Sequence, residues 1–159
     1  MPIERFREAQ DAAVGGFAAA LDELRRGGKR SHWIWYVFPQ LAGLGSSAQS
    51  RRFAIAGEEE AAEYLRDPEL RARYLTITSV VAEQLQSGGT SLRALMGSDI
   101  DATKLVSSLT LFRHVARMLQ AAEGNDDYAE IDRVADAVLT QAAEQGYPPC
   151  AATLRRIRS

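Results

Sequence analysis

The sequence predicts an all-α fold, a compact multihelical single domain that covers residues 1–159. Apolar residues recur at helical spacing in three long segments, and paired runs with strand alternation are missing. Glycine pairs at 15–16, 27–28 and 88–89 punctuate the chain without isolating a second domain. Of the 159 residues, 46% are hydrophobic and 25% are charged, as in ordinary globular proteins. A chain of this length buries enough surface to fold without a disulfide or a metal.

The first elements are expected to be two helices followed by an aromatic segment. Residues 3–10 form a short helix, and Asp11 N-caps a second one that reaches Arg26, where two glycines stop it. Its buried face comprises Phe17, Leu21 and Leu24. In residues 29–40 the apolar run is too short for periodicity to separate strand from helix. Propensity favours strand, but Ser31 as an N-cap and Pro39 as a stop favour a two-turn buried helix, which we expect.

Helices dominate the remainder of the chain. Residues 41–47 form a loop, and Ser47 or Ser50 opens a short turn that carries Phe53 and Ile55 inwards. We expect helices at 58–66, 68–86, 90–96, 102–122 and 127–144, of which the fourth is N-capped by Asp101. Three of them carry apolar stripes: Leu70, Tyr74, Ile77, Val81 and Leu85; Leu105, Leu109, Phe112, Ala116 and Leu119; Tyr128, Ile131, Ala135, Val138 and Ala142. Tyr147-Pro148-Pro149 then turns the chain into a basic tail.

Charge and composition indicate a cytoplasmic protein that binds no membrane. The formal net charge is −2 and the pI is about 5.7, so no global field attracts nucleic acid. The acidic N-terminus does not resemble a signal peptide, and the early apolar stretch at 14–21 is too short to span a bilayer. The lone cysteine, Cys150, fits a reducing compartment and is expected to be a free thiol. Basic residues at Arg51-Arg52, and at Arg155, Arg156 and Arg158, are interpreted as solvated charge, which makes nucleic-acid binding unlikely.

Two segments stand out as carriers of chemistry. Two Trp, a Tyr, a Phe and a His crowd into residues 32–38 of a chain that is only 8% aromatic. They either stack a planar ligand, with His32 and Gln40 as hydrogen-bonding groups and Lys29 or Arg30 against an anion, or they fill the core. In residues 99–112, helical spacing places Lys104, Ser107, Ser108 and Leu111 on adjoining positions. That face either lines a polar pocket or allows close helix packing beside a solvated lysine.

Familiar catalytic templates are missing. The chain has no Gly-rich phosphate loop, HExxH, paired cysteines or Gly-x-Ser-x-Gly elbow. His32 and His114 cannot build a three-histidine site, and we interpret His114 as a residue of a helix surface. We therefore expect no metal site and no cofactor.

Several strings resemble a known family. They are Lys29-Arg30-Ser-His-Trp-x-Trp-Tyr-x-Phe-Pro-Gln40, Leu44-Gly45-x-Ser, Tyr64-Leu65 and Asp101-x-x-Lys104-x-x-Ser107-Ser108-x-Thr110-Leu-Phe112. Together they resemble the bacterial domain-of-unknown-function 1810 family, hypothetical proteins of which some carry the label "calpastatin". The resemblance implies a compact multihelical fold, as in hypothetical mycobacterial proteins, and no established activity. Nothing here resembles a disordered calpain-inhibitory repeat, and Cys150-Ala-Ala-Thr153-Leu154 lacks the acid that the family pattern places before Thr-Leu.

The two segments together suggest a single site. We expect His32, Gln40, Lys104, Ser107 and Ser108 to face one cleft beside Trp33 or Trp35. The function that this favours is binding of a small planar phosphate-bearing metabolite such as a nucleotide derivative, with processing of that metabolite as an extension. Lys29 or Lys104 would meet its charge, and His32 would be the acid or base if catalysis occurs. The alternative is a non-catalytic helical module that binds a protein partner, and nucleic-acid binding ranks third.

Overall fold

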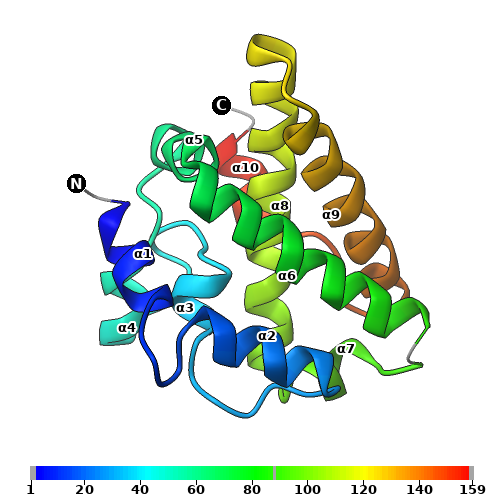
Figure 1. Cartoon of the computed structure of the whole chain (residues 1–159). Helices are drawn as coiled ribbons and strands as arrows, with labels where there is room; N and C mark the ends of the chain where they lie inside the picture. The colour runs from blue at the N-terminus through cyan, green and yellow to red at the C-terminus, as the bar shows by residue number, and fades with distance from the viewer. Residues whose placement is uncertain (1–2, 88, 158–159) are drawn as a thin grey trace.

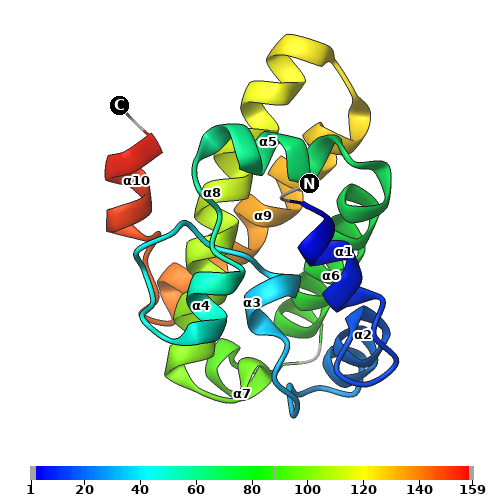
Figure 2. The same ribbon diagram turned by 90° about the vertical axis from the view of Figure 1, so that its left-hand side faces the viewer.

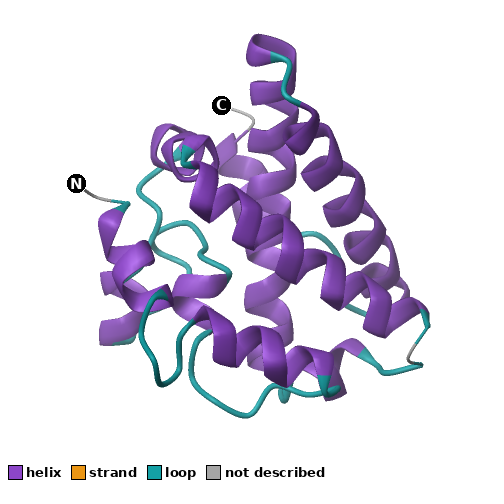
Figure 3. Ribbon diagram, in the orientation of Figure 1, coloured by secondary structure: helices purple, strands orange, loops and turns teal. Residues whose placement is uncertain are grey.

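Helices account for all the regular secondary structure described in the computed structural model, which covers residues 3–87 and 89–157 (Figure 1, Figure 3). The predicted all-α, compact multihelical fold is therefore confirmed. The ten helices within these residues are α1 Glu4–Gln10, α2 Phe17–Arg25, α3 Ile34–Val37, α4 Ala48–Arg52, α5 Glu58–Arg66, α6 Pro68–Gln86, α7 Leu92–Met96, α8 Asp99–Glu123, α9 Asp126–Glu144 and α10 Ala151–Ile157. Among the helices so described, none is long and apolar enough to cross a membrane.

The long helix α8 forms the centre of the fold. It packs along α9, with α6 against α9 and α5 and α10 also in contact with α8 (Figure 1). All fifteen residues of the three predicted apolar stripes are buried in this core. A stripe that recurs at helical spacing makes one face of each helix apolar, so mutual burial of these faces assembles the layers.

The boundaries of three elements differ from the predicted ones. The second helix begins at Phe17 because Gly15 takes a positive φ of 71° and residues 11–16 turn the chain first. Helix α8 begins at Asp99, and its N-cap is Ser98, whose hydroxyl accepts from the Asp101 N–H at 3.1 Å. The predicted cap at Asp101 is therefore wrong. The C-terminal tail folds as α10 and does not continue as an irregular basic segment.

The aromatic segment contains a helix, but a shorter one than predicted. Helix α3 is a single turn whose N-cap position is Trp33, without a side-chain cap. Ser31 does not cap it, because its hydroxyl donates instead to Glu23 Oε2 at 2.6 Å. Glu23 thus organises the turn that leads into α3.

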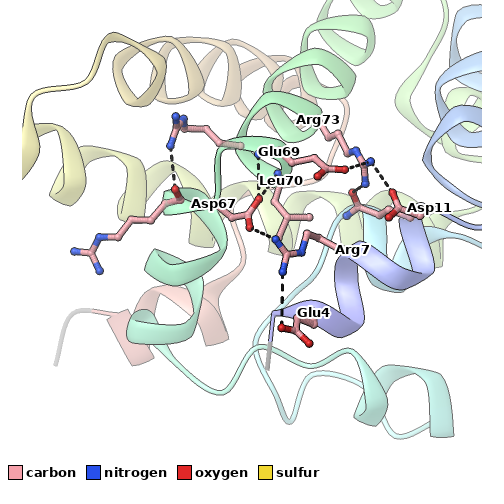
Figure 4. A network of polar contacts seen from close by, with 10 residues as sticks. Glu4, Arg7, Asp11, Asp67, Glu69, Leu70 and Arg73 are labelled. Atoms are coloured by element: carbon pink, nitrogen blue, oxygen red, sulfur yellow. Dashed lines mark hydrogen bonds and ion pairs between the residues drawn. The ribbon is translucent and has the colours of Figure 1, made fainter. Parts of the chain in front are cut away.

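A polar network fastens α1 to the start of α6 (Figure 4). Asp67 accepts at Oδ1 from the N–H groups of Glu69 and Leu70, both at 3.0 Å, and so caps α6. The other carboxylate oxygen of Asp67, Oδ2, accepts a hydrogen bond from Arg7 Nη1 at 2.7 Å. Arg73 bonds Asp11 at 2.7 Å, so the same network also holds the chain just after α1.

The loop that follows α3 is pinned to the segment before α5. The Ile55 N–H donates to the Gln40 carbonyl at 2.9 Å, and the Ala42 N–H donates to the Ile55 carbonyl at 2.8 Å. Between them, Ser47, one of the two serines that the sequence offered for this turn, caps α4 by accepting from the Ser50 N–H at 3.1 Å. These bonds fix the backbone of Gln40 beside α8.

Candidate functional site

Most of the aromatic segment lies in the core. Trp33, Tyr36 and Phe38 are buried, and the indole N–H of Trp33 donates to Glu23 Oε1 at 3.0 Å. Trp35 is only partly buried and faces α8. The crowding of aromatics is therefore explained mainly by packing, with Trp35 as the exception.

Three residues that the sequence analysis assigned to the site are structural. Lys29 is 6% exposed and ion-pairs with Asp101 at 2.8 Å, and its ammonium lies 5.1 Å from the ring centroid of Trp33. Trp33 itself is fully buried. Ser108 is also fully buried, with its hydroxyl 2.9 Å from the Tyr74 hydroxyl. Since each of them is engaged inside the protein, we correct the candidate site by leaving them out.

Two adjoining hollows remain, which we name together the Lys104 groove. Both are lined by Gln40 and Lys104, and they lie on the side where α3, α4 and α10 flank α8 (Figure 2). The narrow part has room for about 10 Å³, the size of one water, and the wide part measures about 380 Å³. The narrow part is lined by Ile34, Trp35, Phe38, Gln40, Ser50, Phe53 and Lys104, and the wide part by Gln40, Leu44, Asp99, Ile100, Thr103, Lys104, Ser107 and Cys150.

The groove brings the two predicted segments together. The Lys104 ammonium lies 5.2 Å from the centroid of the Trp35 ring, a cation–π distance. Ser107, one turn further along α8, lines the wide part and donates to the Thr103 carbonyl at 3.1 Å. Gln40 lines both parts of the groove. Four of the predicted site residues, Trp35, Gln40, Lys104 and Ser107, therefore share one groove.

The indole N–H of Trp35 is a buried donor without a partner among the described residues. A buried unpaired donor costs about 1–3 kcal/mol, so such groups are rare in native proteins. It belongs to a side chain that lines the narrow part of the groove. An acceptor atom of a ligand, or one water that bridges to it, would satisfy this donor.

His32 occupies the edge of this region. Its side chain is exposed and its ring stacks on Trp35 with a centroid distance of 6.4 Å and an interplanar angle of 29°. It does not line either part of the groove. Trp35 therefore lies between His32 and the groove, and a catalytic role for His32 stays a prediction.

The sequence analysis missed the contribution of the C-terminal segment. The Cys150 N–H donates to Thr110 Oγ1 at 3.2 Å, which returns the chain to α8. Cys150 then lines the wide part of the groove. It also lines a third hollow of about 330 Å³, the Tyr147 hollow, whose walls are Thr103, Val106, Ser107 and residues 146–151. Only recognition of α10 as a helix packed on α8 could have placed Cys150 here.

Other concave regions suit an anionic ligand less well. A hollow of about 560 Å³ is lined by four glutamates of α5 and by Arg156, so acidic groups that repel anions predominate there. Another, of about 400 Å³, is lined by Asp22 and Glu23 beside Arg26 and Arg30. Within residues 3–87 and 89–157, no group of three or more potential metal-ligating side chains gathers.

Several of the other charged residues discussed in the sequence analysis contact neighbouring groups of the protein. The guanidinium of Arg52 lies 5.0 Å from the ring centroid of Phe53, and Arg156 donates to the Ala42 carbonyl. His114 is partly exposed and contacts Glu58 at 2.7 Å, which confirms its place on a helix surface. Arg158 lies outside the described residues.

Comparisons with known proteins agree on the fold. The family model described as "Protein of unknown function (DUF1810)" matches residues 1–133. The crystal structure of the conserved hypothetical protein Rv1873 from Mycobacterium tuberculosis is 33% identical, with a TM-score of 0.71 over 96% of this chain and 94% of that one. No curated protein matches. The similar proteins therefore support the fold and leave the function to the geometry of the groove.

Proposed function

The chain belongs to the DUF1810 family of unknown function, whose description specifies no reaction, and we propose from the Lys104 groove that it binds a small, planar, phosphate-bearing metabolite such as a nucleotide derivative. One observation carries the proposal. Gln40 and Lys104, which are distant in the sequence, line both parts of one groove with the Trp35 indole beneath the lysine. A cation, an amide and an aromatic plane are the groups that such a ligand requires.

The size and composition of the groove suit a ligand of this class. Its wide part, about 380 Å³, falls within the usual 300–1,000 Å³ of small-molecule sites. Lys104 is the one cation among the described residues that line it. Asp99, the acid at its rim, is drawn into an ion pair with Arg93 at 3.2 Å. The phosphate is therefore assigned to Lys104, away from Asp99.

The Trp35 indole would hold the planar part of the ligand. In the structure its ring is approached by the Lys104 ammonium and the His32 ring. A phosphate that draws Lys104 away would leave the indole face to a base or another flat ring. Gln40 would then hydrogen-bond with its amide to the polar edge of that ring. Ser107 would offer its hydroxyl in the wide part of the groove.

The proposal extends to the compartment and, conditionally, to catalysis. A metabolite ligand fits the cytoplasmic location expected from the sequence. If the bound ligand is processed, we assign the acid–base role to His32, whose ring stacks on Trp35.

The alternative function, a protein-interaction module, finds less support. Within residues 3–87 and 89–157, the large hydrophobic residues that are exposed are Val14, Ile100 and Met118. Ile100 and Met118 are separated by five turns of α8, roughly 27 Å at 1.5 Å per residue. Apolar residues scattered singly are normal on a protein surface and do not mark an interface.

A thermal-shift screen tests the proposal. Wild type is heated with nucleoside phosphates and sugar phosphates, and so are Lys104→Met and Gln40→Ala. At 100 times its dissociation constant, a ligand adds about 2.7 kcal/mol of stability, which is a shift of roughly 5–10 °C for a domain of this size. We expect a hit that both variants lose.

The matched control is Arg25→Met, which removes one exposed positive charge from α2, away from the groove. It should keep the full shift. If Arg25→Met loses the shift as completely as Lys104→Met, the binding is nonspecific charge attraction. If no compound of either class stabilises wild type, the proposed ligand class is wrong.

A further inference from the structure

The polar groups that line the narrow part of the Lys104 groove are mainly hydrogen-bond donors. The indole N–H of Trp35 and the ammonium of Lys104 can only donate, and Ser50 and Gln40 add a hydroxyl and an amide. None of the described residues that line this part is acidic. The remaining lining residues are apolar and buried: Ile34, Phe38 and Phe53. An occupant therefore has to accept hydrogen bonds, in surroundings where each bond is stronger than in water.

Trp35 supplies a donor that no described residue satisfies. Its Nε1 is shielded from solvent and has no hydrogen-bond partner among the residues described. The indole N–H of Trp33, in contrast, donates to Glu23 Oε1 at 3.0 Å. Native proteins pair nearly all of their buried donors. The Trp35 N–H therefore indicates an acceptor that comes from outside the chain.

The Ser50 hydroxyl is held so that its own proton can be donated to a ligand. The Ser47 hydroxyl accepts from the Ser50 N–H at 3.1 Å and donates to Ser50 Oγ at 2.9 Å. Ser50 Oγ is therefore the acceptor of this pair of hydroxyls. A serine hydroxyl combines one proton with two lone pairs, so the proton of Ser50 stays available to the narrow part, which this side chain lines.

Gly45 gives Ser50 the space that it occupies. A Cβ at position 45 would lie 2.6 Å from Ser50 Oγ and 2.8 Å from Ser50 Cβ, closer than side chains approach each other. The φ of Gly45 is not positive, so the space and not the backbone conformation requires glycine here. An alanine at position 45 would therefore displace Ser50.

The size of the narrow part limits its occupant to a single atom. It has room for about 10 Å³, the volume of one water-sized sphere, and Gln40 and Lys104 line both this part and the wide one. One oxygen of a ligand can therefore enter while the rest of the ligand lies in the wide part. The ionised oxygens of a phosphate group are strong acceptors, whereas a hydroxyl brings a proton of its own and an ammonium only donates.

We propose that the narrow part is a phosphate-oxygen subsite, in which Trp35, Ser50 and Lys104 donate to one non-bridging oxygen of the ligand's phosphate. The inference rests on the proposed function and makes Ser50 a further binding residue, with Gly45 as its positioning residue. The edge of the Trp35 indole then binds the phosphate, and its face is left for the planar part of the ligand. Gln40, which lines both parts of the groove, remains for the ring.

Inorganic phosphate is the probe for this subsite, because it carries the oxygens without a planar part. It is titrated into ¹⁵N-labelled protein while the ionic strength is held constant with sodium chloride. The indole cross-peak of Trp35 should move saturably, because its N–H gains an acceptor. An unmoved cross-peak would mean that the narrow part holds a water molecule at most, which overturns the proposal.

The variant Ser50→Ala tests the hydroxyl. It removes one donor to a charged oxygen, so the dissociation constant of phosphate should rise about tenfold. The matched control is Ser46→Ala, which changes an exposed serine of the same loop that lines neither part of the groove. This control should leave the dissociation constant unchanged. A Ser50→Ala variant that binds phosphate as tightly as wild type, or no more weakly than Ser46→Ala, contradicts the role of Ser50.

The variant Gly45→Ala tests the positioning of that hydroxyl. It should weaken phosphate binding because the new Cβ displaces Ser50. Since both changes act on the same donor, the double variant with Ser50→Ala should bind phosphate about as tightly as the weaker of the two single variants. Losses that multiply contradict a role of Gly45 through Ser50. Circular dichroism and thermal melting establish that each variant is folded, and Ser50→Ala serves alone if Gly45→Ala does not fold.

Comparison with a nucleoside phosphate separates this inference from the proposed function. A nucleoside phosphate that needs Lys104 and Gln40, but binds Ser50→Ala as tightly as wild type, overturns the phosphate-oxygen subsite and leaves the proposed function intact. Inorganic phosphate that needs Ser50, when no nucleoside phosphate binds more tightly than phosphate itself, supports the subsite and overturns the proposed function. Nucleoside phosphates that bind more tightly than phosphate and also need Ser50 support both.

Discussion

Replacement of Glu23 by glutamine should loosen the turn that positions the groove aromatics. One Glu23 oxygen accepts from the N–H groups of Arg30 and Ser31, at 2.7 and 2.8 Å, and from Trp33 Nε1 at 3.0 Å. The other accepts from the Ser31 hydroxyl at 2.6 Å. A glutamine keeps the shape but loses the charge, and its amide nitrogen replaces one acceptor. The turn that leads into α3 then loses its anchor.

The magnitude follows from the pKa of Glu23. Burial raises this pKa, but the hydrogen bonds from the Ser31 hydroxyl, the N–H groups of Arg30 and Ser31, and the Trp33 indole outweigh burial and lower it from 4.5 to about 2. At 1.36 kcal/mol per pKa unit the shift corresponds to about 3 kcal/mol. Partial exposure and screening reduce this, so we expect Glu23→Gln to lower the free energy of unfolding by roughly 2 kcal/mol.

Urea unfolding of wild type and Glu23→Gln, at pH 7 and at pH 3.5, is the assay. The folded-state pKa lies below the unfolded value, so the stabilisation is complete above pH 4.5 and is lost as the pH falls towards 2. Roughly two-fifths of the difference between the two proteins should disappear by pH 3.5. Asp22→Asn is the control, because its exposed pair with Arg26 should contribute 0.5 kcal/mol or so. Equal losses in the two variants, or a Glu23→Gln difference that does not change with pH, would show that the Glu23 charge does not hold this turn.

Two further pairs of substitutions test the fold by urea unfolding at pH 7. Gly16→Ala should cost about 2 kcal/mol or more, because a Cβ there would lie 2.1 Å from the Ala12 carbonyl oxygen. Gly28→Ala, whose Cβ has its nearest neighbour at 3.8 Å, should change stability by less than about 0.5 kcal/mol, and equal costs at the two glycines would contradict the packing. Tyr74→Phe should cost about 1–2 kcal/mol by leaving the buried Ser108 hydroxyl unpaired, and the double variant with Ser108→Ala should cost less than the sum of the two single changes. Strict additivity would mean that the two hydroxyls are not coupled.

Local signals in the sequence suffice for the long helices that form the core. Asp67 followed by Pro68 marks the start of α6 because the aspartate caps free N–H groups and the proline lacks one. The buried stripe of α8 follows from its helical spacing. Signals of this kind depend on residues that are close together in the sequence. Tertiary contacts therefore do not change the helices that they predict.

The composition of the site depends on contacts that no local signal contains. Ser31 is a good N-cap type, but Glu23 on another helix takes its hydroxyl, so α3 starts without it. Lys29 appears available for an anion until Asp101 is brought within 2.8 Å. Trp33 and Trp35 are indistinguishable by type, and only the packing of α3 on α8 determines which of them is buried. The meeting of Gln40 with Lys104 was predictable as a hypothesis, whereas the arrival of Cys150 was not.

The indole N–H groups offer the most direct test of the groove as a ligand site. The chain has two tryptophans, so a ¹H–¹⁵N spectrum contains two indole cross-peaks, which Trp35→Phe assigns. The Trp33 indole N–H donates to Glu23, whereas that of Trp35, whose side chain lines the groove, has no partner among the described residues. On titration with a nucleoside phosphate that stabilises the protein, the Trp35 cross-peak should move saturably, the Trp33 cross-peak should stay in place, and Lys104→Met should abolish the change. Saturable binding that leaves the Trp35 cross-peak unmoved would contradict the account.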